Sequence, residues 1–236
     1  MTREPILKIV DVVKKFGEVM AVDHCSIDFE RGSITGLIGP NGAGKTTLFN
    51  LITGVLQPDS GNIFFKGGDI TGKRPYEIAR RGVGRTYQLI RIFPKMTLLE
   101  NLIVVGKGKG EKAVERAMDL LRLIKLIGKK EEYASDLSFG QQKLLSLAQV
   151  LMLDAELILL DEPAAGINPT LQNELMDLIH QLNRDGKTFI IVEHDMNVIM
   201  GHCQNAVALN YGQKIAEGPC SEIQKNELLL EHYFGR

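Results

Sequence analysis

A glycine-rich segment of the sequence has the residue types and spacing of a loop that binds phosphate groups: Gly39, Pro40, Asn41, Gly42, Ala43, Gly44, Lys45 and Thr46. Glycines let the backbone approach a ligand closely, so that successive N–H groups and a following helix can surround a triphosphate. Lys45 adds a positive charge for the phosphate oxygens, and the Thr46 hydroxyl can ligate Mg²⁺. We expect these eight residues and Thr47 to contact a nucleotide. A glycine-rich turn without a ligand is the weaker alternative.

Two carboxylates follow an apolar run further along the chain. Residues 157–160 read Leu-Ile-Leu-Leu and lead into Asp161 and Glu162. A buried strand of this kind delivers its last residues to the carboxyl edge of a parallel sheet, where ligands bind. Asp161 suits the oxygen shell of Mg²⁺, and Glu162 suits a general base that activates water. Taken alone, such a pair more often begins an ordinary loop, and the phosphate loop is what favours the functional interpretation.

A third segment, Leu137-Ser138-Phe139-Gly140-Gln141, precedes a stretch with helical periodicity over 143–153. Ser138 is a suitable N-cap for that helix. In isolation, a capped helix start is the favoured interpretation of this segment.

The elements expected around these segments indicate an α/β protein. Roughly alternating polarity over 6–29, with a turn at 16–18, predicts an antiparallel hairpin, and a strand over 33–38 and a helix over 46–56 flank the phosphate loop. Residues 95–153 carry mainly helical signals, including a helix over 112–127, with expected mobile joints at 82–93 and 128–136. Strands over 157–160, 188–192, 206–209 and 213–216 alternate with helices over 170–184 and 196–203, which predicts a mainly parallel sheet covered on both faces.

Composition narrows the class of protein. The 236 residues are 44% hydrophobic and 24% charged, as in an ordinary folded protein, and the net charge of -1 gives no basic field for nucleic acid. Cys25, Cys203 and Cys220 are far apart and fit reduced thiols. No stretch approaches the ~18 apolar residues of a membrane helix, and the N-terminus lacks the pattern of a signal peptide. We expect a soluble chain, so any transport would need a second protein to cross the bilayer.

Taken in order, the segments resemble those of ABC ATPase cassettes over nearly the whole chain. The set is the phosphate loop, Gln88 within Gly-Arg-Thr-Tyr-Gln, the Leu-Ser-Phe-Gly-Gln segment, Asp161-Glu162, residues 165–168 and Glu193-His194-Asp195. The resemblance implies a P-loop NTPase core with a mainly parallel sheet, an N-terminal antiparallel β subdomain and an inserted helical subdomain. It implies one domain over 1–236, with the core at about 1–94 and 154–236 and the helical subdomain at about 95–153.

The same resemblance implies roles for individual residues. Lys45, Gln88, Glu162 and His194 would form the catalytic set, Thr46, Gln88 and Asp161 would hold Mg²⁺, and Phe16 would stack on adenine, although core packing is an alternative for that ring. Ser138, Gly140 and Gln141 would complete the ATP site of a second subunit, and Asn168 would contact that subunit. One departure is Phe139, because the commonest family signature has glycine there.

Further similarity narrows the expected function within the family. Residues 85–94, 162–169, 193–196, 210–212 and 215–218 resemble ATP-binding subunits of branched-chain amino acid importers. This implies a peripheral location at the cytoplasmic face of the membrane, a homo- or heterodimeric partner subunit, membrane permease subunits and an extracytoplasmic solute-binding protein. Alternatives are ATPases for urea or amide import or for lipopolysaccharide export, and a soluble ABC ATPase of translation or DNA repair. A GTPase is disfavoured, since no Asn-Lys-x-Asp element is present.

Overall fold

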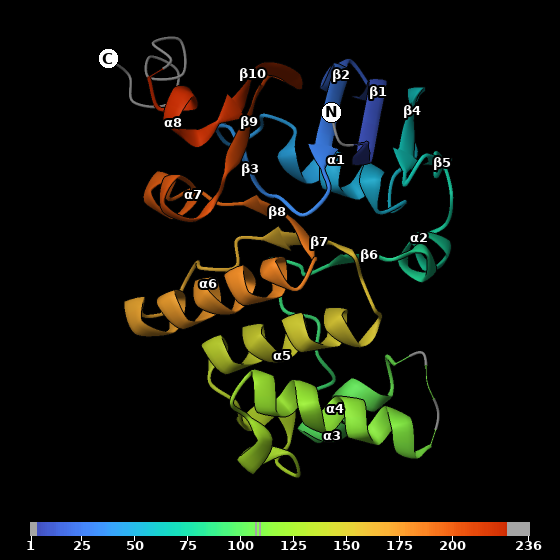
Figure 1. Ribbon diagram of the computed structural model, residues 1–236. Coiled ribbons are helices and arrows are strands. Elements are labelled where there is room, and N and C mark those ends of the chain that lie inside the picture. The colour runs from blue at the N-terminus through green and yellow to red at the C-terminus, as the bar shows by residue number, and fades with distance from the viewer. Residues whose placement is uncertain (1–3, 107, 109, 226–236) are drawn as a thin grey trace.

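Two β-sheets form the upper part of the molecule in a computed structural model, which describes residues 4–106, 108 and 110–225 (Figure 1). A four-stranded antiparallel sheet has the order β2-β1-β4-β5, and a six-stranded sheet has the order β10-β9-β3-β8-β7-β6. In the second sheet all neighbouring strands are parallel except β9 and β10. The strands are β1 (Pro5–Phe16), β2 (Val19–Glu30), β3 (Ile34–Ile38), β4 (Ser60–Phe65), β5 (Gly68–Asp69), β6 (Val83–Arg85), β7 (Leu157–Asp161), β8 (Thr188–Val192), β9 (Asn205–Asn210) and β10 (Gln213–Pro219).

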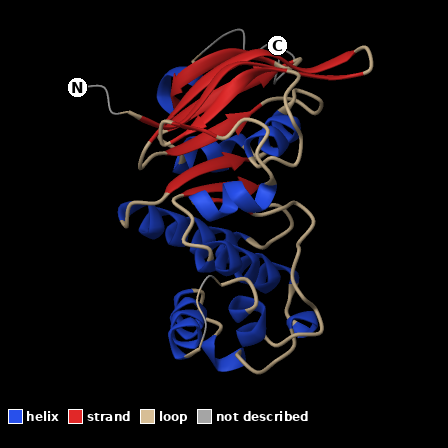
Figure 2. Cartoon of the chain, turned by 90° about the vertical axis from the view of Figure 1, so that its right-hand side faces the viewer, coloured by secondary structure: helices blue, strands red, loops and turns tan. Residues whose placement is uncertain are grey.

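Helices cover the six-stranded sheet and extend below it. Figure 2 shows the strands gathered at one end of the molecule and helices alone at the other. The helices are α1 (Lys45–Ile52), α2 (Pro75–Arg81), α3 (Leu98–Ile103), α4 (Glu111–Leu123), α5 (Phe139–Met152), α6 (Pro169–Arg184), α7 (Met196–His202) and α8 (Cys220–Ile223), with short 3₁₀ turns at Ile127–Lys129 and Ala134–Asp136. The predicted α/β fold, with its antiparallel and mainly parallel sheets and its helical region, is confirmed.

The central strands are buried on both faces, which explains their uninterrupted apolar sequences. In β7, Leu157 and Leu159 pack into a core with α1 and the antiparallel sheet, whereas Ile158 and Leu160 pack into a second core. That second core joins the sheet to α3–α7. The six-stranded sheet is therefore the common wall between two hydrophobic cores.

Several predicted boundaries were wrong for local reasons. The helix expected over 46–56 ends at Ile52, because Gly54 takes a left-handed conformation with φ 71°. The helix expected to reach 127 ends at Leu123, and Lys125 has φ 58°. Part of the joint expected over 82–93 is strand β6, which pairs with β7. Helix α2 had not been predicted.

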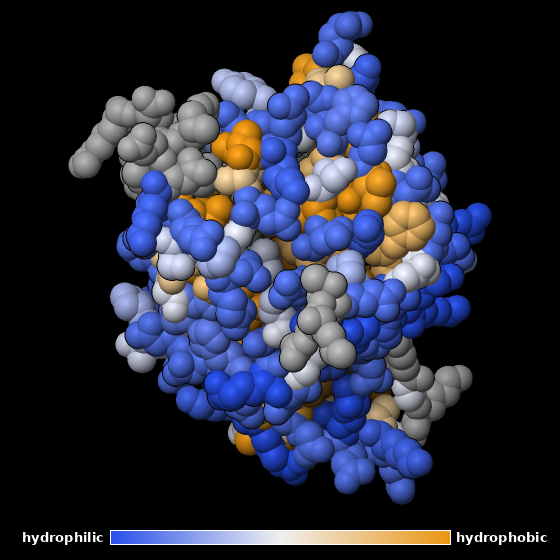
Figure 3. All heavy atoms as spheres, turned by 45° about the horizontal axis from the view of Figure 1, so that its top comes forward, coloured by the Kyte–Doolittle hydropathy of each residue, from blue (hydrophilic) through white to orange (hydrophobic). Residues whose placement is uncertain are grey.

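The outer surface is mostly polar. Hydrophilic side chains cover most of the face in Figure 3, and the apolar groups on it form small patches. Within the described residues, no helix combines the length and the apolar character needed to span a membrane.

Candidate nucleotide-hydrolysis site

The phosphate loop connects β3 to α1, as the sequence predicts. Gly42 and Gly44 have φ angles of 83° and 100°, which favour glycine over any residue with a side chain. A Cβ atom at Gly44 would lie 2.4 Å from the Ala21 carbonyl oxygen, so the loop also has no room for a side chain there. The loop therefore brings its backbone N–H groups and the start of α1 to one place.

Lys45 is the first residue of α1 and is almost fully buried. Its Nζ atom donates hydrogen bonds to the carbonyl oxygens of Gly39 (2.5 Å) and Pro40 (2.9 Å). Burial lowers the pKa of this ammonium, and the nearby carboxylates of Glu162 and Asp161 act in the opposite direction. The lysine is thus held inside the loop, next to where phosphate oxygens would bind.

A cavity of about 580 Å³ opens beside the loop. Its wall includes side chains from loops after three neighbouring parallel strands: Gln88 follows β6, Glu162 follows β7 and His194 follows β8. The carboxyl ends of parallel strands are the usual place for a ligand in such a sheet. The other lining residues are Phe16, Ala21, Asn41, Gly42, Ala43, Gly44, Lys45, Thr46, Thr47 and Val192.

Phe16, at the end of β1, is 48% exposed and lies on the cavity wall. The ring is therefore not enclosed in the core, which was the alternative for this residue. Lys14 Nζ is 5.8 Å from the ring centroid. A half-exposed aromatic face at the cavity edge suits stacking against a planar base.

Two of the predicted catalytic side chains, His194 and Gln88, contact the carboxylate of a third, Glu162. His194 Nε2 lies 2.7 Å from Glu162 Oε1, and Gln88 Nε2 donates to Glu162 Oε2 at 2.9 Å. The Glu162 side chain is 13% exposed, so the carboxylate is shielded from bulk water but reachable from the cavity. Its backbone has φ 51°, a left-handed conformation that costs roughly 1–2 kcal/mol for a residue with a Cβ atom.

Asp161 is oriented differently from its neighbour and does not line the cavity. Its Oδ2 atom forms a buried ion pair with Arg85 Nη2 at 2.8 Å, and Arg85 also donates to Asn50 Oδ1 at 2.6 Å. No role for Arg85 was expected from the sequence. A buried aspartate requires a partner, but nothing in the sequence shows which cation supplies it.

The oxygen donors predicted for Mg²⁺ fit that ion in chemical type. Thr46, Gln88 and Asp161 offer a hydroxyl, an amide and a carboxylate, all of which are ligands of a hard cation. Mg²⁺ in nucleotide sites takes only one or two carboxylates and completes its shell with phosphates and water. Accordingly, the described residues contain no group of three or more His, Cys, Asp or Glu side chains arranged for a metal ion.

The Leu-Ser-Phe-Gly-Gln segment begins α5 and lies outside the cavity. Ser138 Oγ accepts from the Gln141 N–H at 3.4 Å, and the Gln141 side chain accepts from the Ser138 N–H at 3.1 Å. Gly140 packs against α6, where a Cβ atom would lie 2.1 Å from Leu171 Cδ2. Ser138, Gly140 and Gln141 are therefore not brought to the cavity of their own chain.

Phe139, the departure from the common signature, is half-exposed and turns toward its own chain. A Cβ atom on Gly166 would lie 3.1 Å from its ring, and Lys143 Nζ is 5.3 Å from the ring centroid. Nearby, Asn168 caps α6 by accepting from the Leu171 N–H at 3.0 Å.

No role was expected from the sequence for two charged residues behind the site, although Glu193 belongs to the Glu193-His194-Asp195 motif. Glu193 is 4% exposed and accepts the Ala164 N–H at 2.6 Å, and burial raises the pKa of its carboxyl group. Lys143 donates to main-chain oxygens after β7. The position of Glu193, beside His194 and after a buried strand, was a usable signal, whereas Lys143 had none.

Comparisons with known proteins agree with this geometry. The family model described as ABC transporter matches residues 22–165. The probable branched-chain amino acid transport ATP-binding protein LivG of Archaeoglobus fulgidus is 38% identical, over 98% of this chain and 95% of its own length. The high-affinity branched-chain amino acid transport ATP-binding protein LivG of Escherichia coli (strain K12) is 35% identical, over 98% of both chains.

Solved structures give the same result. A nucleotide-free ATP-binding cassette from an ABC transporter superposes with a TM-score of 0.90 at 34% identity, covering 98% of this chain and 99% of its own. A dimeric bacterial ABC transporter cassette has a TM-score of 0.81 at 26% identity, covering 91% and 98%. The chain belongs to the ABC transporter family, as an ATP-binding and ATP-hydrolysing subunit.

Proposed function

We propose that two subunits enclose ATP between the phosphate loop of one and Ser138–Gln141 of the other, and that hydrolysis drives transport through separate membrane proteins. The observation that carries this proposal is the separation within one chain. Lys45, Gln88, Glu162 and His194 surround one cavity, while the exposed Ser138 end of α5 does not reach it. The N-terminus of a 14-residue helix suits an anion, so a phosphate on a second subunit is a suitable partner. The dimeric state of a solved relative supports this assembly.

Within each site, Lys45 and the loop N–H groups bind the phosphates, and Phe16 stacks on adenine. Thr46 and Gln88, which line the cavity, and Asp161, which here pairs with Arg85 outside the cavity wall, would hold Mg²⁺, and the bound ion would neutralise charge on the phosphate oxygens. Glu162 accepts a proton from the attacking water, and His194 orients the carboxylate through its 2.7 Å contact. Because Gln88 also bonds this carboxylate, the three side chains form one connected unit.

The helical segment 95–153 acts in this proposal as a subdomain that moves relative to the core, which comprises about 1–94 and 154–236. Its motion carries the effect of ATP binding to permease subunits at the cytoplasmic face of the membrane. An extracytoplasmic solute-binding protein completes the system. The full-length similarity to two LivG proteins supports branched-chain amino acids as the transported solute.

Uptake in cells tests the transport function. Cells lacking this chain are expected to take up radiolabelled leucine slowly, and the wild-type chain but not the Lys45→Ala variant is expected to restore uptake. Urea uptake in the same cells is the control for solute class. Normal leucine uptake without the chain, or loss of urea uptake alone, would contradict the assigned solute. Co-purification tests the assembly: when this chain is purified from detergent-solubilised membranes, two hydrophobic membrane subunits are expected to remain bound to it.

A further inference from the structure

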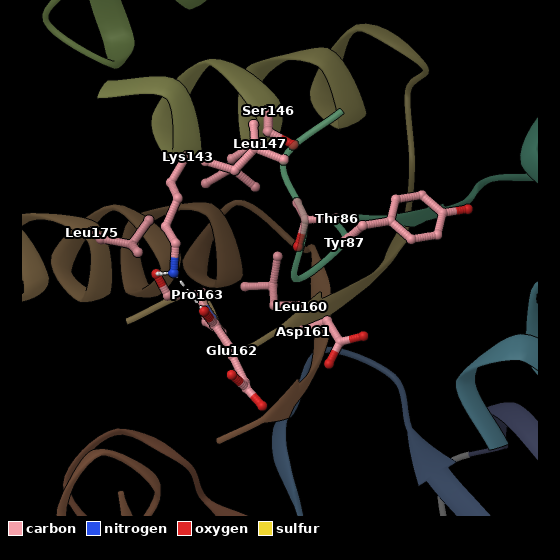
Figure 4. A pocket seen from close by; sticks show the side chains of 11 residues that line it. Thr86, Tyr87, Lys143, Ser146, Leu147, Leu160, Asp161, Glu162, Pro163 and Leu175 are labelled. Atoms are coloured by element: carbon pink, nitrogen blue, oxygen red, sulfur yellow. Dashed lines mark hydrogen bonds between the residues drawn. The ribbon is translucent and has the colours of Figure 1, made fainter. Parts of the chain in front are cut away.

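Lys143 connects α5 to the turn that follows β7. Its side chain extends from α5 toward the main chain of Glu162 and Pro163 (Figure 4). Its Nζ atom donates to the carbonyl oxygens of Glu162 at 2.7 Å, Pro163 at 3.1 Å and Ala165 at 2.5 Å. An ammonium group has three N–H donors, so this one turn uses all of them.

The turn that Lys143 holds is strained at the residue that matters for catalysis. Glu162 has φ 51°, and a residue with a side chain keeps such a conformation only when its surroundings enforce it. Glu193 supports the turn from another side by accepting the Ala164 N–H. Lys143 therefore binds the carbonyl groups of the turn and Glu193 binds an N–H group.

The ammonium group of Lys143 is partly buried where it makes this contact. The residue is only partly exposed, and burial lowers the pKa of its ammonium, while the carboxylates of Glu193 and Glu162 act in the opposite direction. Lys143 does not line the cavity beside the phosphate loop. It is therefore placed to act on the nucleotide site through the main chain of Glu162 and not by touching ATP.

We propose that Lys143 is a positioning residue for ATP hydrolysis, which fixes the Glu162 carboxylate by holding the main chain of its turn and makes that position depend on α5. This inference rests on the proposed role of Glu162 as the base. Ser138, at the start of α5, faces the ATP of the other subunit in the proposed dimer. One helix thus links both sites, and a shift of α5 either carries the Glu162 turn along or breaks three hydrogen bonds.

The first test separates positioning from folding. Lys143→Met is expected to lower kcat for ATP by about 10- to 100-fold, the scale expected when a reacting group is displaced by a fraction of an ångström to one ångström. KM for ATP is expected to stay within about twofold, because the phosphate loop is untouched. Lys143→Arg, which keeps the charge and several donors, is expected to recover much of the lost kcat.

Lys187 provides a matched control. Its Nζ atom donates to the Ala155 carbonyl at 2.7 Å, and Lys187 is also partly buried. Lys187 directly precedes β8, so it lies at the amino end of the parallel strands and not at the carboxyl end where the cavity is. Lys187→Met is expected to lower Tm without changing kcat. Equal kcat losses in the two methionine variants would overturn the inference. Should Lys143→Met fail to fold, Lys143→Gln, with two donors, is expected to give an intermediate kcat, and unchanged turnover there would also overturn it.

A double-mutant cycle tests whether Lys143 acts through Glu162. In a Glu162→Gln background, Lys143→Met is expected to slow single-turnover hydrolysis by less than about twofold, because the group that it positions is already lost. A full additional 10- to 100-fold loss would show that Lys143 acts elsewhere. Unchanged hydrolysis in Glu162→Gln alone would instead contradict the proposed base, so the two failures are distinguishable.

Discussion

The phosphate loop and the turn over 162–168 meet at the same cavity, which the turn reaches through Glu162, but they are held in shape by different means. In the loop, Gly42 and Gly44 adopt left-handed conformations without a steric cost from a side chain. In the turn, Glu162 adopts such a conformation against its preference, and Lys143 and Glu193 hold the neighbouring backbone from distant elements. The loop is a local structure, whereas the turn depends on tertiary contacts.

The largest expected effect concerns the side chain that the turn presents. Glu162→Gln removes the proton acceptor while keeping the size and most hydrogen bonding of the side chain, so kcat is expected to fall by about 10²- to 10⁴-fold. Binding of a fluorescent ATP analogue is expected to be unchanged, since Glu162 is not part of the phosphate loop. A steady-state ATPase assay beside a binding titration measures both quantities. Loss of binding in parallel with kcat would mean that the turn also shapes the nucleotide pocket.

The local character of the loop is tested at Gly44. Gly44→Ala is expected to weaken ATP binding by more than about tenfold, because the new Cβ would lie 2.4 Å from the Ala21 carbonyl oxygen and the loop must shift. Gly186→Ala is the control, since Gly186 has φ 92° but a Cβ atom there would meet no other atom within 4 Å. This control is expected to lose some Tm and no ATP affinity. Similar affinities for both variants would show that loop shape does not limit binding.

The smallest expected effect concerns the pH dependence of the contacts behind the turn. Burial raises the pKa of Glu193 above its ordinary 4.5, so the folded protein binds this proton more tightly than the unfolded chain does. The carboxyl group therefore favours the folded state most below pH 4.5 and loses that contribution as the pH rises through its folded-state pKa. Glu193→Gln, whose amide oxygen can still accept the Ala164 N–H, is expected to gain Tm relative to wild type across that rise.

Thermal unfolding from about pH 4 to about pH 8 measures this difference. Each kcal/mol corresponds to about 2–4 °C for a chain of this size. A Tm difference that stays constant with pH would show that Glu193 has the same pKa in both states.

The fold and the members of the site could be predicted to different extents. Residues 39–46 specify their own conformation through glycine, and the apolar runs of β3, β7 and β8 indicated a buried parallel sheet, so both could be predicted from sequence. The partners of buried charges could not. Arg85 pairs with Asp161, 76 residues away, and Lys143 reaches the Glu162 carbonyl across 19 residues, and no local pattern marks either contact.

Helix ends showed the same limit on a smaller scale. The apolar period that predicted a helix to residue 56 continues past Ile52, but the left-handed Gly54 stops the helix. A short helix such as α2, with Ile78 as its buried residue, offers too little periodicity to be recognised. Length alone does not decide this, because α7 also has seven residues and was predicted; α7 buries Val198 and Ile199, whereas α2 buries Ile78 alone.

At Glu162, the residue that ATP hydrolysis requires is one whose left-handed backbone conformation lowers the stability of the fold. Glycine would relieve the conformational cost there, and asparagine would reduce it, but neither could accept a proton from water. Selection for a rigid, heat-resistant chain would thus favour replacing this glutamate, and only the demand for hydrolysis retains it. In a cassette of the family that no longer hydrolysed ATP, we expect this glutamate to be among the first residues replaced by glycine or asparagine.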